Sequence, residues 1–193
     1  TGGIDAFALG IYSVNPDAEV YVKVTNSWYD PKAEEEAARK LLDMNCDVIA
    51  QHCDTVYPQT LAQQKGVYSI GYNSDMSKEA PEACLCSVIW NWSAYYTSAV
   101  QSVIDGTWDG SNYYGGMNEN LVSITPIADF AAAATKEKVN MAKQQILSGK
   151  NGVFDGVIKT NTGAEVGTAG KTLEDSVITG GINWYFKTVK VIE

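Results

Sequence analysis

Short apolar runs alternate with amphipathic segments over the first hundred residues. The runs are rich in β-branched and aromatic residues, which predicts strands at residues 18–28, 46–54, 67–75 and 83–92. Helices are predicted over residues 30–45, 55–66 and 93–108. Asp30 before Pro31 is typical of a helix start, and Gly66 is typical of a helix end. Short strands separated by helices indicate βαβ units, so we expect an α/β fold with a Rossmann-like parallel sheet covered on both faces.

The second half of the chain has a less regular pattern. Residues 112–127 are expected to form a loop and a strand, and residues 128–150 a long helix that ends at Gly149. Residues 153–193 are rich in Gly and Thr and predict short strands. No internal repeat divides the sequence.

Polar and aromatic residues follow each of the four predicted strands. In open parallel sheets, ligands bind beyond the carboxyl ends of the strands, so these residues form a candidate ligand-binding rim. Its members are Asn26, Trp28, His52, Asp54, Asn73, Asp75 and Trp90. Single members have structural alternatives, because Asp30 and Asp54 could cap helices and Trp28 could cover a helix end.

Charge and composition exclude several kinds of partner. The 193 residues contain 14 Lys and Arg against 23 Asp and Glu, a net charge of −9 with no basic cluster, so nucleic acid is not expected as a partner. No apolar run reaches the roughly 20 residues of a membrane-spanning helix, and the first residues carry no export signal.

The cysteines and the single histidine argue against a metal site. Cys46, Cys53, Cys84 and Cys86 form no C-x-x-C pair, and we expect buried free thiols rather than a disulfide. With one histidine, no zinc-ligand spacing is available, so neither a metal nor a cofactor is predicted.

An enzyme requires an activated nucleophile or an acid/base pair. His52 and Asp54 lie two residues apart, but no nucleophile motif or phosphate-binding loop accompanies them, and no catalytic residue is predicted. His52 is either a ligand contact or a structural histidine. The 11 Tyr and 5 Trp leave a sugar-binding module as an alternative to other small-molecule sites.

Five segments taken together carry a resemblance to a known family. They read TNSWYDP, DVIAQHCD, KGVYSIGYNSDMS, SVIWNWSAYY and VIDGTWDGSNYYGGM. In this order and spacing they resemble the BMP (basic membrane protein) family of ABC-transporter substrate-binding proteins, which includes bacterial purine-nucleoside receptors. The resemblance implies a type I periplasmic binding protein, whose two lobes close on a ligand and present it to an ABC permease. It also implies an extracytoplasmic location, periplasmic or lipid-anchored to the outer face of the cytoplasmic membrane.

The resemblance also suggests which part of such a protein is present. The chain begins at what resembles the first helix of the second lobe, so the N-terminal lobe is expected to be largely missing, together with the signal segment. On this basis, residues 1–92 are expected to form the second-lobe α/β core with the ligand rim. Residues 93–193 are expected to supply the crossover helix and the returning segments that complete the lobes.

Two positions differ from the nucleoside-binding members that the chain resembles. Those members typically carry Asp where Asn73 stands and Lys where Trp90 stands, and these charged groups hold ribose hydroxyls. The expected ligand is a purine base such as adenine, or a nucleoside, and the two lost charges favour the base. An indole at Trp90 offers a stacking face and suits the cleft, whereas Trp92 is expected in the core.

The helix predicted at 93–108 carries an apolar stripe that requires a partner. The stripe consists of Tyr96, Ala99, Val100, Val103 and Ile104. In the two-lobed family this part of the chain would pack on the first lobe. Without that lobe we expect a homo-oligomer, or else a second half that folds back onto its own sheet.

Overall fold

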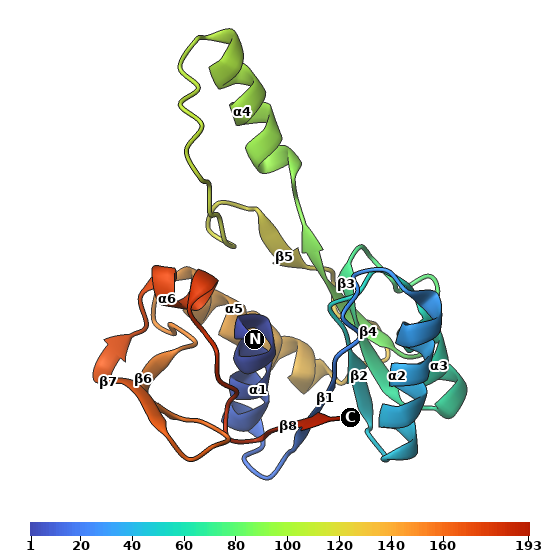
Figure 1. Cartoon of the computed structure of the whole chain (residues 1–193). Helices are drawn as coiled ribbons and strands as arrows, with labels where there is room; N and C mark the ends of the chain where they lie inside the picture. Colours follow the sequence, from blue (N-terminus) through green and yellow to red (C-terminus); the bar gives the residue numbers. More distant parts are fainter. The chain divides into compact units, whose positions relative to one another are not determined.

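The structure, a computed structural model, describes residues 1–193 and contains two compact units (Figure 1). Thr25–Glu137 form one unit, here called the central unit. Thr1–Val24 and Lys138–Glu193 form the other, here called the terminal unit. No helix has the length and apolar character needed to cross a membrane.

The central unit is built on a four-stranded sheet of order β2-β3-β4-β5. Strands β2, β3 and β4 are parallel to one another, and β5 is antiparallel to β4. The elements are α2 (Pro31–Asp43), β2 (Val48–Ala50), α3 (Tyr57–Lys65), β3 (Tyr68–Asn73), β4 (Cys84–Trp90), α4 (Ser93–Ile104) and β5 (Val122–Ile124). The predicted α/β fold with a parallel sheet is confirmed.

Helices α2 and α3 lie side by side and pack against the sheet (Figure 1). Their core consists of Ala38, Leu42, Ile49, Leu61 and Ala62. Both helices begin and end close to the predicted positions, because the signals are local. Asp30 caps α2 by accepting the N–H of Ala33 at 3.0 Å, and Gly66 ends α3 in the left-handed region at φ 71°.

The other face of this sheet is less covered within the central unit than predicted. Ser69 and Gly71 of β3 are buried and lie on the same face as Ile49, which packs against α2 and α3. Tyr68 points to the opposite face and is 50% exposed. The Tyr68 ring stacks on Phe130 with 5.9 Å between centroids. Helical cover of both faces is therefore not achieved by the elements of this unit alone.

The terminal unit combines two small sheets with helices. Its elements are α1 (Gly2–Val14), β1 (Val20–Lys23), β6 (Asp155–Lys159), β7 (Glu165–Thr172), α6 (Asp175–Gly180) and β8 (Val189–Ile192), and most of α5 (Ala133–Leu147) also belongs to it. Strand β1 pairs with β8 in parallel, and β6 with β7 antiparallel. The core is formed by Ala8, Val20, Phe154, Ile158, Phe186 and Val189.

The pairing of β1 corrects one expectation. The sequence pattern places this strand in one sheet with the next three, but it pairs with β8 in a separate two-stranded sheet. The predicted division into residues 1–92 and 93–193 refers to the lobes of a two-lobed protein, not to the two compact units described here. That division stays a prediction.

Candidate functional site

Three parallel strands of the central unit end at one edge of the sheet. The register pairs Ala50 of β2 with Ile70 of β3, and Asn73 at the end of β3 with Ile89 of β4. The residues that follow these positions therefore emerge at the same edge. All seven residues predicted for the rim belong to this unit.

Asp54 connects the first three segments of the rim. Its backbone N–H donates to the carbonyl oxygen of Trp28 at 2.9 Å. Its carboxylate Oδ1 accepts a hydrogen bond from the Asn73 side-chain amide at 3.3 Å. The segment after β1, the loop after β2 and the end of β3 thus meet, although β1 itself is not a strand of this sheet.

Two asparagines of the rim have a left-handed backbone conformation. Asn26 has φ 56° and Asn73 has φ 68°, both in the left-handed region. Asparagine tolerates this region better than most residues, because its short polar side chain bonds locally. Each asparagine therefore turns the chain and also presents an amide at the rim.

His52 keeps an exposed edge and lies against an aromatic ring. The His52 and Tyr72 rings are 5.0 Å apart between centroids, with 37° between their planes. Burial lowers the pKa of His52 below its ordinary value of 6.5. The imidazole is therefore neutral at pH 7, with one nitrogen that donates and one that accepts a hydrogen bond.

Asp75 stands at the start of a tight turn and is ionised. Its Oδ1 accepts the N–H of Ser77 at 3.0 Å, and the hydrogen bonds to Ser77 lower the pKa of Asp75. The next residue, Met76, is buried and donates its N–H to the Ser87 hydroxyl at 3.1 Å. A side chain at Gly71 would collide with that hydroxyl, so this glycine permits the close packing that fixes the turn.

Trp90 and Trp92 form the start of an aromatic stack. Their rings lie 5.3 Å apart at 18°, and Trp92 continues onto Tyr96 of α4 at 5.9 Å and 16°. Trp92 is 47% exposed, so its predicted place in the core is wrong. The cause is that α4 extends away from the sheet instead of packing on it (Figure 1).

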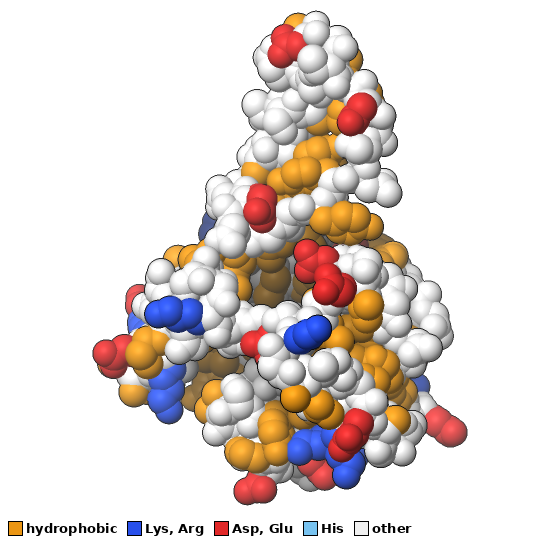
Figure 2. All heavy atoms as spheres, turned by 90° about the vertical axis from the view of Figure 1, so that its left-hand side faces the viewer, with side chains coloured by type: hydrophobic (Ala, Val, Ile, Leu, Met, Phe, Trp, Pro, Cys, Tyr) orange, Lys and Arg blue, Asp and Glu red, His pale blue; other side chains and the backbone are white.

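The α4 stripe is exposed in this structure. Tyr96, Val100, Val103 and Ile104 all have more than half of their surface accessible, and none of the residues of α4 is buried. Figure 2 shows hydrophobic side chains gathered along this projecting part of the central unit, at the top of the view. No element of the central unit therefore covers the stripe.

Two residues near the rim were not predicted as part of it. Tyr72 contacts His52, and buried Glu34 binds the loop after β2. Gln51, which the sequence places beside His52 at the end of the second predicted strand, donates to the carbonyl oxygen of Thr55 at 2.7 Å. Tyr72 lies two positions after Ile70, and His52 lies two positions after Ala50, the register partner of Ile70, so the parallel pairing explains why the two rings meet. Helical spacing could have separated Glu34 from Glu35 and Glu36, because Glu34 shares the buried face of α2 with Ala37, Ala38 and Leu42.

The rim residues are not all in mutual contact. No hydrogen bond or ring contact joins Trp90 or Asp75 to His52, Asp54 or Asn73. All four cysteines are free, with Cys84 buried and the others half-buried, and burial raises the pKa of Cys86 to about 11. No group of three His, Cys, Asp or Glu side chains is arranged to hold a metal ion.

A groove of about 700 Å³ lies apart from these residues, in the terminal unit. Its lining includes Asn161, Asn183, Trp184 and Tyr185, and no charged side chain. None of the seven rim residues contributes to it.

The chemistry at the rim itself is that of a binding surface, with amides, carboxylates, a neutral imidazole and indoles.

Comparison with known sequences gives one family match. The family model described as "ABC transporter substrate-binding protein PnrA-like" matches residues 1–153. A purine-binding protein of Brucella abortus is 38% identical over 183 residues, which are 95% of this chain and 52% of that protein. A putative ABC transporter glucose-binding protein of Haloferax volcanii is 35% identical over 153 residues, 79% of this chain and 39% of that protein. The chain therefore spans about half the length, or less, of these relatives.

Solved structures agree on the fold. An ABC transporter solute-binding protein from Conexibacter woesei has a TM-score of 0.55 and 21% identity over 78% of this chain and 52% of that chain. A transcriptional activator of the comK gene from Bacillus halodurans has a TM-score of 0.58 and 19% identity over 65% of this chain and 45% of that chain. At these identities the likeness shows the fold alone, which is that of the periplasmic binding proteins.

Proposed function

Because the chain belongs to the family of PnrA-like ABC transporter substrate-binding proteins, we propose that it forms part of the solute-binding component of an ABC importer and binds a purine base. The observation that carries the proposal is that the Asp54 backbone bonds to the Trp28 carbonyl oxygen while its side chain bonds to Asn73, so that three rim segments meet at one edge of the sheet. Family membership supports a binding protein rather than an enzyme. The side chains at the rim support the proposed class of ligand.

The side chains at the rim match the chemistry of a flat heteroaromatic ring. Indoles provide stacking faces, each contributing about 0.5–1.5 kcal/mol beyond the area it buries. Amides and carboxylates complement the donors and acceptors along a purine edge. The Brucella relative is named as a purine-binding protein, which supports the same ligand class.

A base is proposed rather than a nucleoside because of Asn73 and Trp90. The nucleoside-binding members that the chain resembles carry Asp and Lys at these positions, where the charges hold ribose hydroxyls. Asn73 instead donates its amide to Asp54, and Trp90 stacks on Trp92. Neither position offers a charge to a sugar.

A monosaccharide is the second candidate ligand. The Haloferax relative is named as a putative glucose-binding protein, and aromatic side chains also form platforms for sugars. The base is favoured over the sugar because the Brucella relative matches at higher identity and over more of this chain than the Haloferax relative does.

The remaining partners follow from the family. We propose that the ligand is held between this lobe and a second lobe, delivered to an ABC permease, and captured in the periplasm or by a lipid-anchored form on the outer face of the cytoplasmic membrane.

We also propose that this chain by itself associates with a second copy through α4. Residues 83–104 contain no charged side chain, so two copies can meet there without like charges inside the contact, although each copy has a net charge of −9. The exposed apolar stripe of α4 supplies the surface that such a contact would bury.

Tryptophan fluorescence tests the ligand class, because Trp28 and Trp90 belong to the rim. Titration with adenine is expected to quench the emission of the chain, whereas glucose is expected to leave it unchanged. Quenching by glucose alone would reject the purine assignment.

A further inference from the structure

Glu34, in the first turn of α2, is buried and fully bonded. The side chain is 2% exposed. Its Oε1 accepts the N–H of Asp30 at 3.0 Å, and its Oε2 accepts both the N–H and the hydroxyl of Thr55, at 3.0 and 2.6 Å. The carboxylate therefore joins the start of α2 to the loop after β2, across 21 residues of sequence.

All three partners of Glu34 are donors, which suits a carboxylate and no other side chain of this size. A glutamine would keep one acceptor oxygen and turn its NH₂ group towards a donor that has no acceptor to offer. The N-terminal end of α2 also stabilises a negative charge at this position. The arrangement thus depends on the charge of Glu34 as well as on its length.

The loop held by Glu34 is the one that carries two rim residues. Residues 52–54 lie between β2 and Thr55, and Asp54 is bonded at the same time to the carbonyl oxygen of Trp28. Gln51 closes the loop from the other side through its bond to the Thr55 carbonyl oxygen. Fixing Thr55 therefore fixes the backbone from which His52 and Asp54 extend.

We propose that Glu34 is a positioning residue for ligand binding: it does not touch the ligand, and it holds His52 and Asp54 in the arrangement that binds. This role rests on the proposed function of the rim. It predicts that the loss of the carboxylate loosens the 52–55 loop while α2 and the sheet remain folded.

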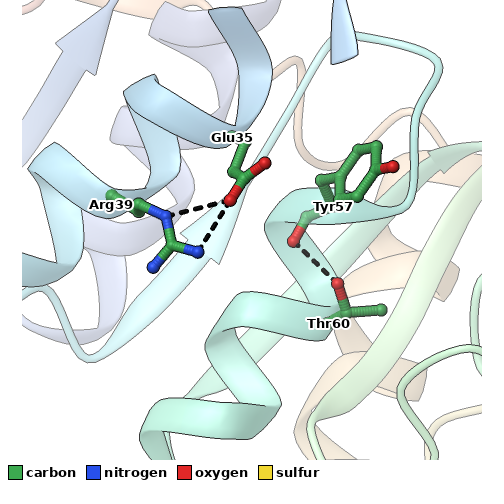
Figure 3. Close-up of polar contacts among 4 residues, drawn as sticks. All are labelled: Glu35, Arg39, Tyr57 and Thr60. Atoms are coloured by element: carbon green, nitrogen blue, oxygen red, sulfur yellow. Dashed lines mark hydrogen bonds and ion pairs between the residues drawn. The ribbon is translucent and has the colours of Figure 1, made fainter. Parts of the chain in front are cut away.

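Glu35 provides a matched control on the same helix. It is half-buried and pairs with Arg39 one turn later, with 2.7 Å between Oε1 and Nη2 (Figure 3), and no hydrogen bond joins its side chain to residues 52–55. Glu35→Gln makes the same chemical change as Glu34→Gln, one residue away. Exposed ion pairs of this kind contribute little to stability.

The first measurement is amide hydrogen exchange in the full chain without ligand. Exchange at Thr55 and Asp54 is expected to speed up about tenfold or more in Glu34→Gln, the effect of losing a hydrogen bond to a charged group, and to stay unchanged in Glu35→Gln. Unchanged exchange at Thr55 in Glu34→Gln would overturn the proposal. This readout holds whether or not the rim binds a purine.

The second measurement is affinity for adenine. Glu34→Gln is expected to weaken binding about tenfold, and Thr55→Val by less, because Thr55 keeps its backbone N–H. Thr55→Val should add nothing further in the Glu34→Gln background, since both changes act on one contact. Faster exchange with unchanged affinity would reject the positioning role, and a wild-type chain that binds no adenine would reject the proposed function instead. If Glu34→Gln fails to fold, Thr55→Val alone decides, through exchange at Asp54 and affinity together.

Discussion

The side-chain amide of Asn73 donates a hydrogen bond to the carboxylate of Asp54, with 3.3 Å between nitrogen and oxygen. This bond joins the end of β3 to the loop after β2, so the two amino-acid positions act as one unit of the rim. The neutral amide at position 73 complements the Asp54 carboxylate as a hydrogen-bond donor. A second carboxylate at this position would not.

Asn73→Asp is expected to make the stability of the chain more pH-dependent. Two carboxylates at this distance repel by about 1 kcal/mol at the dielectric of water, which raises the pKa of the pair above the unfolded value. Because the pKa of the pair is raised in the folded state, the variant should be about as stable as the wild type at about pH 4 and below. Its unfolding free energy should fall below that of the wild type as the pH rises towards 7. Thermal melting of both proteins across this range is the measurement.

Asn73→Gly is the control for this change. Glycine tolerates the left-handed backbone at φ 68° and removes the hydrogen bond without adding charge. The difference in melting temperature between Asn73→Gly and the wild type should not vary with pH. A pH-independent difference for Asn73→Asp as well would show that the two carboxyl groups do not interact.

Asp30 and Asp75 are expected to differ in their effect on the ligand. Asp30→Ala removes the N-cap of α2 and should cost about 1 kcal/mol of unfolding free energy with little loss of affinity. Asp75→Asn keeps an oxygen for the N–H of Ser77 but removes the charge at the rim, and should weaken purine binding about tenfold with little change in melting temperature. Calorimetric melting and binding titration of both variants separate the roles, and a larger affinity loss for Asp30→Ala would reverse them.

Asp5 in the terminal unit is expected to limit stability at neutral pH. Its side chain is buried, one oxygen accepts the N–H of Phe186 at 2.6 Å, and the other has no partner. Burial raises the pKa of Asp5 above 3.8, although the bond to Phe186 opposes the change. Stability from the neutral form is therefore complete below pH 3.8 and is lost as the pH rises through the folded pKa.

Asp5→Asn removes this titration. Relative to the wild type, the variant should gain on the order of 1 kcal/mol of unfolding free energy between pH 4 and pH 7. Urea unfolding at several pH values measures the difference. A constant difference across the range would mean that Asp5 ionises as readily in the folded state as in the unfolded state.

Local signals explain which elements could be predicted from the sequence. The ends of α2 and α3 follow from Asp30, Pro31 and Gly66, whose effects depend on neighbouring residues only. The pairing of β1 with β8 joins Val20 to Val189 and has no counterpart in local pattern. Alternation also cannot distinguish a tryptophan buried in a core from one exposed on a projecting helix, and Trp92 was misplaced for this reason.

The sequence predicts where the rim lies in the sheet, but it does not predict the contacts among the rim residues. Parallel strands bring His52, Asn73 and Trp90 to one edge whatever the side chains are. The Asp54–Asn73 bond depends on the left-handed turn at Asn73, and the role of Glu34 depends on a loop 21 residues away. Both are tertiary features: helical spacing places Glu34 on the buried face of α2, but it does not identify Thr55 as the partner of the carboxylate.

Association through α4 is expected to be visible in the mass of the chain. Light scattering during size exclusion should give a mass above the 20.9 kDa of one copy. The double substitution Val103→Asp and Ile104→Asp should restore a monomer, because it places charge on the exposed stripe. Ser98→Asp, on the opposite side of the helix, should leave the association unchanged. A monomeric wild-type chain at micromolar concentration would rule out self-association.

Isothermal titration of this chain with adenine, adenosine and glucose tests the central claim most directly, because it compares the base, the nucleoside and the sugar on one rim. Adenine is expected to bind more tightly than adenosine, since Asn73 and Trp90 offer no charge to ribose, and glucose is expected to release no binding heat. Tighter binding of adenosine than of adenine, or binding of glucose alone, would contradict the account.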